Sequence, residues 1–186
     1  KPLLAGGIDL FIVETFTNVD ELTQAVSAIR KHSDLPIIAS ITVSEDGRTL
    51  LGMRPELFTP IVDALDIDVI GLNCSVGPKI MLDVIQRMQD YTNKPLAAQP
   101  NAGHPRIYQD RTIYMCSPEY MASYSRKLIK AGVQILGGCC GTTPEHISEI
   151  NQSVKAFQPL QALTRANVPK KFENPDIVPV PMAEKS

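Results

Sequence analysis

The chain has 186 residues, with 18 lysines and arginines against 20 aspartates and glutamates. The formal net charge of −2 excludes a strong basic field, so we expect no nucleic-acid partner and no membrane held by charge. With 44% hydrophobic and 20% charged residues, the composition is typical of a soluble globular domain and excludes a disordered chain. The sequence has no apolar run of about 18 residues, and we therefore expect no transmembrane helix.

Five short apolar runs predict buried β-strands. They are rich in Ile, Val and Leu and lack the polar alternation of strands that expose one face to water. The five runs are 9–14, 36–43, 69–73, 95–99 and 134–137.

Helical patterns separate these runs. Asn18 is a typical N-cap, Pro78 suits a first turn, and Ser117 and Thr143 each precede a proline at a predicted helix start. Gly132 predicts the end of the helix that begins at Ser117. Between the second and third strands a further helix is expected over 54–65, although a proline within it predicts a kink or a restart.

Strand followed by helix, five times over, predicts an α/β fold with parallel strands and right-handed crossovers. A long loop, 100–116, follows the fourth strand on the carboxyl side, where parallel α/β folds carry their ligands. We expect one domain over 1–157. The proline-rich stretch 158–186 is expected to be an extended linker or tail.

Three cysteines are predicted to lie at the carboxyl ends of strands. Cys74 directly follows one apolar run, and Cys139 and Cys140 follow another within a glycine-rich turn. Since the carboxyl ends of parallel strands share one edge of the sheet, we expect these thiols to converge. The glycines free the backbone to turn, so that both neighbouring sulfurs can face one centre. Three thiolates with an open fourth position are typical of a catalytic zinc ion.

Other interpretations of the cysteines stay open. A lone cysteine at a strand end is commonly a packed apolar residue, and Cys74 taken alone would be interpreted in that way. Cys139 and Cys140 can instead form a vicinal-dithiol redox centre, although a disulfide between neighbours is strained. Cys116, with no partner spacing, is interpreted as incidental. Four cysteines are too few for a disulfide scaffold, which favours reduced thiols and a cytoplasmic location.

Both cysteine segments resemble the zinc-binding motifs of the homocysteine S-methyltransferase family. They read Gly-Leu-Asn-Cys-Ser-Val-Gly-Pro at 71–78 and Gly-Gly-Cys-Cys-Gly-Thr-Thr-Pro-Glu-His-Ile at 137–147. The run Phe-Ile-Val-Glu-Thr-Phe at 11–16 resembles the family strand whose glutamate holds the amino group of homocysteine.

A further segment, Gln-Pro-Asn-Ala-Gly at 99–103, is similar to one branch of that family. The branch includes cobalamin-dependent methionine synthase and bacterial homocysteine methyltransferases fused to methylenetetrahydrofolate reductase. Arg111, Tyr114 and the segment 117–120 extend the similarity.

The resemblance spans about residues 3–157 and implies a (β/α)8 TIM barrel, of which this chain holds the C-terminal five βα units. The family's opening segment, with a first-strand Asp-Gly motif that helps to hold homocysteine, is not among the 186 residues. We therefore expect a fragment of a longer chain, in which a methylenetetrahydrofolate reductase domain can follow. A non-catalytic half-barrel is the alternative.

The resemblance also implies roles for individual residues. Zn²⁺ bound by the three cysteines would take the homocysteine sulfur as its fourth ligand. Glu14 would pair with the substrate ammonium group. Asn101 would take the fourth coordination position on the zinc when homocysteine is absent. A helix is predicted to begin at 75–78, and its free N–H groups suit the substrate carboxylate. The plainer alternatives are a solvated carboxylate for Glu14, a turn residue for Asn101 and an N-cap for Ser75.

The methyl donor stays open among methylfolate, methylcobalamin and S-methylmethionine, with the similar branch favouring folate-linked donors. The three histidines are weaker candidates for function. His32 and His146 fit surface positions at helix ends, whereas His104 lies in the long loop and is a candidate for donor contacts.

Overall fold

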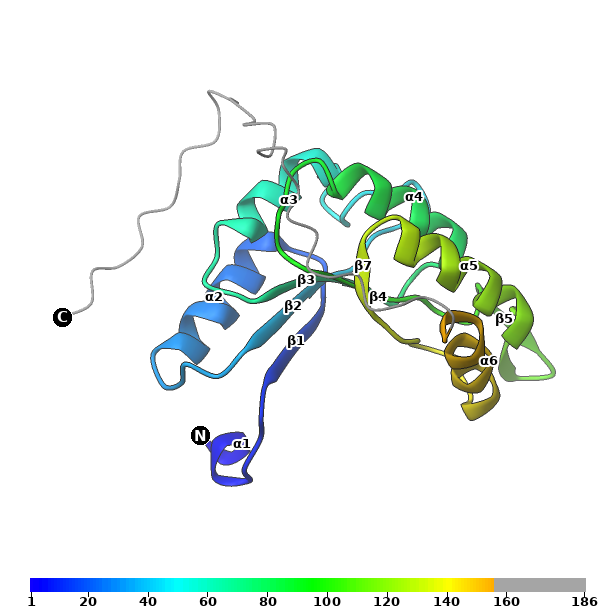
Figure 1. Ribbon diagram of the computed structural model, residues 1–186, viewed down its shortest axis with the longest axis horizontal. Coiled ribbons are helices and arrows are strands. Elements are labelled where there is room, and N and C mark those ends of the chain that lie inside the picture. Colours follow the sequence, from blue (N-terminus) through cyan, green and yellow to red (C-terminus); the bar gives the residue numbers. More distant parts are fainter. Residues whose placement is uncertain (156–186) are drawn as a thin grey trace.

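Five parallel strands form one curved sheet in the computed structural model, which describes residues 1–155 (Figure 1). The strands are parallel, as predicted, and they lie in chain order, so each crossover leads to the neighbouring strand. They are β1 (Phe11–Phe16), β2 (Ile37–Ile41), β3 (Val69–Asn73), β4 (Leu96–Gln99) and β7 (Val133–Leu136). The expected tail at 158–186 lies outside the described residues.

Most helices follow the outer side of the curved sheet, whereas the short first helix precedes β1 and lies apart from that layer (Figure 1). The helices are α1 (Pro2–Ala5), α2 (Val19–Arg30), α3 (Pro55–Asp63), α4 (Pro78–Met88), α5 (Pro118–Lys130) and α6 (Pro144–Val154). The predicted caps are confirmed: Asn18 Oδ1 accepts the Asp20 N–H at 2.8 Å, and Ser117 Oγ accepts the Tyr120 N–H at 3.2 Å. The proline inside α3 neither restarts nor divides that helix.

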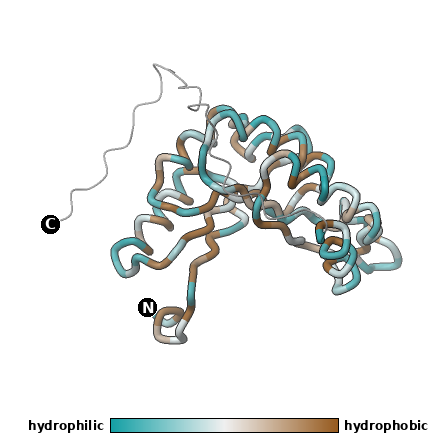
Figure 2. The backbone as a smooth tube through the Cα atoms, in the orientation of Figure 1, coloured by the Kyte–Doolittle hydropathy of each residue, from teal (hydrophilic) through white to brown (hydrophobic). Residues whose placement is uncertain are grey.

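The main core lies between the sheet and the helices. Leu22, Phe58 and Ile85 are fully buried there against strand residues such as Ile41 and Leu72. The strands are mainly brown in Figure 2, because most of their residues on this outer side are apolar. No helix within residues 1–155 combines the length and the apolar character that crossing a bilayer requires.

The inner side of the sheet is lined by a smaller apolar cluster. Ile38, Val69 and Ala97 are buried together there, at register positions shared with Ile12 of β1 and Ile135 of β7. Ile12 and Ile135 are 50% and 39% exposed. Both belong to strands that have one hydrogen-bonded neighbour in the described sheet. The apolar residues on the inner side of the sheet are therefore buried at its centre and exposed at its two edge strands.

The expected loop 100–116 contains an antiparallel hairpin that sequence reasoning did not predict. Its strands are β5 (Pro105–Tyr108) and β6 (Arg111–Tyr114). The two turn residues, Gln109 and Asp110, have φ values of 46° and 58°. Two successive positive φ values are typical of a type I′ turn, which usually contains glycine or asparagine, so the usual hairpin signal is missing from this sequence.

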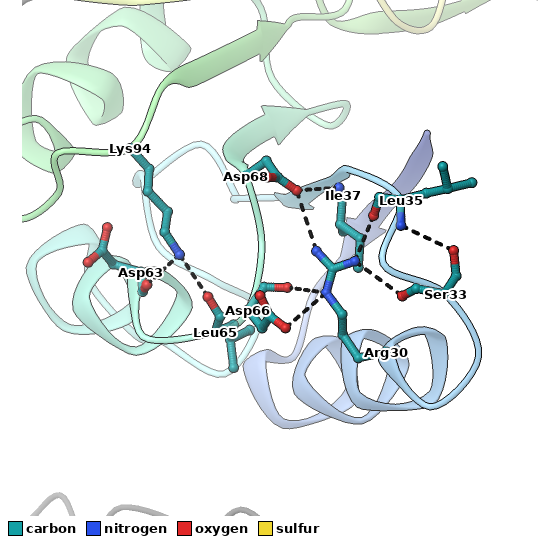
Figure 3. Close-up of polar contacts among 9 residues, drawn as sticks. All are labelled: Arg30, Ser33, Leu35, Ile37, Asp63, Leu65, Asp66, Asp68 and Lys94. Atoms are coloured by element: carbon teal, nitrogen blue, oxygen red, sulfur yellow. Dashed lines mark hydrogen bonds and ion pairs between the residues drawn. The ribbon is translucent and has the colours of Figure 1, made fainter. Parts of the chain in front are cut away.

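Arg30 joins α2 to the amino ends of β2 and β3 (Figure 3). Its guanidinium donates to the carbonyl oxygens of Leu35 at 2.6 Å and Asp66 at 2.9 Å, and to Asp68 Oδ2 at 3.4 Å. The same Asp68 oxygen accepts the N–H of Ile37, the first residue of β2. One planar side chain thus satisfies carbonyl groups that the turns leave free, at the edge of the sheet opposite the cysteines.

Replacing Arg30 should therefore destabilise the fold. We expect Arg30→Ala to lower the free energy of unfolding by about 2–3 kcal/mol and Arg30→Lys by about 1–2 kcal/mol, since lysine keeps the charge but not the fork of donors. Urea unfolding followed by circular dichroism measures both values. The control is Arg48→Ala, which removes an exposed pair with Asp46 at 3.8 Å and should cost less than about 0.5 kcal/mol. Equal effects of Arg30→Ala and Arg48→Ala would contradict this account.

Candidate metal centre

Three sulfur atoms converge at the carboxyl edge of the sheet. Cys74 Sγ lies 3.6 Å from Cys140 Sγ, and Cys139 Sγ lies 4.0 Å from Cys140 Sγ. All three atoms lie within 4.8 Å of one another. Ligands about 2.3 Å from a tetrahedral zinc ion lie about 3.8 Å apart, so the spacing fits three corners of such a site. The predicted convergence is confirmed, and Cys116 is not part of the group.

Main-chain hydrogen bonds between three loops hold the sulfurs together. The Cys74 N–H donates to the Gln99 carbonyl at 3.1 Å, and the Cys139 N–H donates to the Pro100 carbonyl at 2.8 Å. The Ala102 N–H in turn donates to the Cys140 carbonyl at 2.9 Å. The loop after β4 therefore lies between the two cysteine loops and bonds to both.

The backbone at Cys74 is in an uncommon conformation. Cys74 and Ser75 have φ values of 61° and 59°, in the left-handed region that residues with a side chain rarely adopt. This turn carries the chain away from β3 before α4 begins at Pro78, with Gly77 as its N-cap. Strain of this kind persists where surrounding contacts impose it, and it is concentrated at functional sites.

Glycines allow close packing around the cysteine pair. A Cβ at Gly138 would collide with the Thr142 side chain, and a Cβ at Gly141 would collide with the ring of Tyr114. Gly141 also has a φ of 76°. The ring of Tyr114, from β6, therefore lies directly against the turn that follows Cys140.

The three thiols form a poor environment for negative charge without a cation. Burial, together with the neighbouring Cys74 thiol, raises the pKa of Cys139 to about 12. Partial desolvation and the Cys140 thiol also raise the pKa of Tyr114. Because thiolates are the form that binds metals, a cation must displace the protons from this group as it binds.

Glu14 lies at the end of the edge strand β1 and is exposed. Asn73 Nδ2 approaches Glu14 Oε2 at 3.5 Å, so the carboxylate lies beside the residue that directly precedes Cys74. Asn73 is 1% exposed and was not singled out from the sequence. Its position before a cysteine motif was the signal that could have identified it.

Asn101 and Ser75 have structural partners. Asn101 is 3% exposed, and its Oδ1 accepts the Cys140 N–H at 3.1 Å, so it supports the cysteine turn. Ser75 Oγ accepts a hydrogen bond from Thr42 Oγ1 at 2.8 Å. The first-turn position predicted for Pro78 is confirmed, whereas the N-cap alternative for Ser75 is wrong, because the strained turn places Gly77 at the N-cap of α4.

The histidines lie outside the sulfur group. His32 is exposed, as expected, and His104 Nδ1 lies 3.2 Å from Glu45 Oε1 on the surface. The surface position predicted for His146 is wrong: its side chain is buried, with Nε2 2.9 Å from the Cys116 carbonyl oxygen. His146 is buried because the hairpin connection packs against the first turn of α6, a long-range contact that local helix periodicity does not reveal.

Comparisons with known proteins agree with this geometry. The homocysteine S-methyltransferase family profile matches residues 1–154. The methionine synthases of Mycobacterium leprae and Mycobacterium tuberculosis are 33% and 34% identical to the chain over 158 residues. Those alignments cover 82% of this chain and 13% of each synthase, so the chain spans about an eighth of these relatives.

Solved structures show the same fold. The apo form of the homocysteine methyltransferase MmuM from Escherichia coli superposes with a TM-score of 0.67 at 22% identity, covering 81% of this chain and 52% of that one. The metallated form of the same protein gives a TM-score of 0.66 and 46% coverage of that chain. The alternating βα units thus match part of a TIM barrel. Together with the family profile, which matches 154 of the 186 residues, these similarities show that the chain belongs to the homocysteine S-methyltransferase family.

Proposed function

We propose that this chain carries the zinc and homocysteine sites of an enzyme that transfers a methyl group to the homocysteine thiol, forming methionine. The observation that carries the proposal is the group of three sulfurs, within 4.8 Å of one another and held by main-chain hydrogen bonds. Membership of the family supports it. Because the chain spans 13% of each methionine synthase, activity of the 186 residues by themselves is a separate question for experiment.

In this proposal Cys74, Cys139 and Cys140 hold Zn²⁺ and leave one position for the substrate sulfur. A zinc ion bound there supplies the positive charge that keeps a thiol ionised at neutral pH. Glu14 pairs with the substrate ammonium group, and the loop at Ser75 faces the substrate carboxylate. Asn101 holds the Cys140 turn and, when homocysteine is absent, offers an amide oxygen to the metal.

A vicinal-dithiol redox function has less support. Cys140 Sγ lies closer to Cys74 Sγ, at 3.6 Å, than to Cys139 Sγ, at 4.0 Å. The raised pKa of Cys139 leaves little thiolate for attack on a disulfide. A third converging sulfur is also unnecessary for dithiol chemistry, whereas a metal site requires it.

The wider context of the enzyme is part of the same proposal. Residues 1–157 are proposed as part of the catalytic domain and 158–186 as a linker or tail, which a methylenetetrahydrofolate reductase domain can follow in a longer chain. The thiols favour a reducing, cytoplasmic location. The methyl donor is methylfolate, methylcobalamin or S-methylmethionine.

Methyl transfer is the direct test of this function. The zinc-loaded chain should form methionine from homocysteine with one of the three donors, measured by mass spectrometry with an isotopically labelled methyl group. Zinc-free protein is the control and should be inactive, because the substrate thiol is then mostly protonated at neutral pH. Zinc and homocysteine binding without transfer from any donor would support the alternative of a non-catalytic half-barrel.

Zinc binding should depend on three of the four cysteines. Cys74→Ser, Cys139→Ser and Cys140→Ser should each weaken zinc affinity about a hundredfold or more, because one strong ligand is lost. Affinity should rise with pH, since each bound thiol releases its proton. Competition with a chelator dye measures these values. Cys116→Ser is the matched control and should bind like the wild type; full zinc affinity in any of the other three variants would exclude this ligand set.

Glu14 should act on the substrate and leave the metal unaffected. Glu14→Gln keeps the side-chain size but removes the charge, which weakens a contact of about 1.5–3 kcal/mol, so homocysteine affinity should fall roughly ten- to a hundredfold. Isothermal titration of the zinc-loaded protein measures the change. Zinc content should stay whole, and 4-mercaptobutyrate, which lacks the amino group, should bind both proteins equally.

The control for this prediction is Glu21→Gln, which neutralises an exposed glutamate in the first turn of α2. That variant should bind homocysteine like the wild type. Zinc loss in Glu14→Gln would make Glu14 structural and leave the amino-group role without support.

A further inference from the structure

Asn73 connects the metal centre to the far edge of the sheet. It is the last residue of β3 and directly precedes Cys74, yet its side chain reaches across the end of β2 to β1. Its Oδ1 accepts the Thr15 N–H at 2.8 Å, and its Nδ2 donates to Thr15 Oγ1 at 2.7 Å. The same Nδ2 points to Glu14 Oε2 at 3.5 Å.

Thr15 needs this support. Its φ of 65° lies in the left-handed region, where a β-branched residue is a genuine outlier. The pairing of β1 with β2 is also interrupted here, between Val13 and Phe16, so the regular ladder does not hold this part of β1. The two hydrogen bonds between Asn73 and Thr15 therefore hold the backbone and the side chain of the residue that follows Glu14.

From these contacts we infer that Asn73 is a positioning residue, which holds Glu14 in place for the ammonium group of an amino-acid thiol bound at the cysteine centre. The inference rests on the proposed function and deepens it. Asn73 does not act on the metal or on the reacting sulfur; it aligns the carboxylate on β1 with the cysteine loop that begins at the next residue. The asparagine amide suits this task because it accepts and donates at once without adding charge beside the thiols.

The test separates this role from a purely structural one. In the full, zinc-loaded chain, Asn73→Ala should weaken homocysteine binding about tenfold, because the Glu14 carboxylate is then no longer held in place for the ammonium group. Binding of 4-mercaptobutyrate should change less than about twofold, and zinc content should stay whole. The double variant with Asn73→Ala and Glu14→Gln should bind homocysteine no more weakly than Glu14→Gln alone, because Asn73 acts through Glu14.

Two other variants complete the experiment. Asn93→Ala is the matched control, since Asn93 is exposed in the connection between α4 and β4, at the opposite end of the sheet; it should behave like the wild type. If Asn73→Ala loses zinc, the substitution is repeated in a Thr15→Gly background, where glycine accepts the positive φ without strain. In that background Asn73→Ala should keep its full zinc content and should again weaken the binding of homocysteine selectively.

The outcomes are distinguishable. If Asn73→Ala weakened the binding of homocysteine and 4-mercaptobutyrate equally, the inference would be overturned while the proposed function stands. The same holds if the effects of Asn73→Ala and Glu14→Gln on homocysteine affinity multiplied in the double variant. A wild-type chain that binds zinc but no homocysteine would overturn the proposed function and with it the substrate role of Asn73. Hydrogen exchange at the Thr15 amide needs no substrate: Asn73→Ala should accelerate it about tenfold, and unchanged exchange would remove the contact on which the inference is built.

Discussion

Main-chain hydrogen bonding between the loops after β3, β4 and β7 is the constraint on which the site depends. Cys139 and Cys140 follow Cys74 by 65 and 66 positions in the chain, yet the three thiols lie side by side. They do so because the main chain of Gln99, Pro100 and Ala102 forms hydrogen bonds with the backbone of all three cysteines. Each bond runs between parallel loops that the sheet already places together, so little additional chain ordering is needed. The loop after β4 contributes none of the sulfurs, yet it determines their spacing.

Strain accompanies this arrangement directly after β3 and near the end of β1. Cys74, Ser75 and Thr15 all adopt positive φ values, although none is glycine. Conformations of this kind cost on the order of 1–3 kcal/mol each and survive only where other contacts impose them. Here the imposing contacts are the Gln99 carbonyl for Cys74 and the Asn73 side chain for Thr15. The fold thus maintains an unfavourable backbone where the proposed substrate and metal meet.

Sequence reasoning was strongest where the signal was local and periodic. The apolar runs identified all five parallel strands, and capping residues such as Asn18 and Gly132 located helix boundaries to within a residue or two. The convergence of the cysteines followed from topology, because parallel strands end at one edge. What escaped were features decided by long-range contacts: the I′ hairpin without glycine, the buried His146, and Asn73, whose partners lie 58 and 59 positions away.

The two buried asparagines near the cysteines follow one physical logic. Asn73 Oδ1 accepts the Thr15 N–H and Asn101 Oδ1 accepts the Cys140 N–H, so each amide fixes the backbone at the carboxyl end of another strand. An aspartate would accept the same N–H groups, but it would place a buried negative charge near Cys139, whose thiol pKa burial already raises. A neutral acceptor adds no negative charge, so a metal ion bound at the cysteines would have to balance the charge of the thiolates alone. The amide thereby separates the task of holding the loops from the task of stabilising the thiolates.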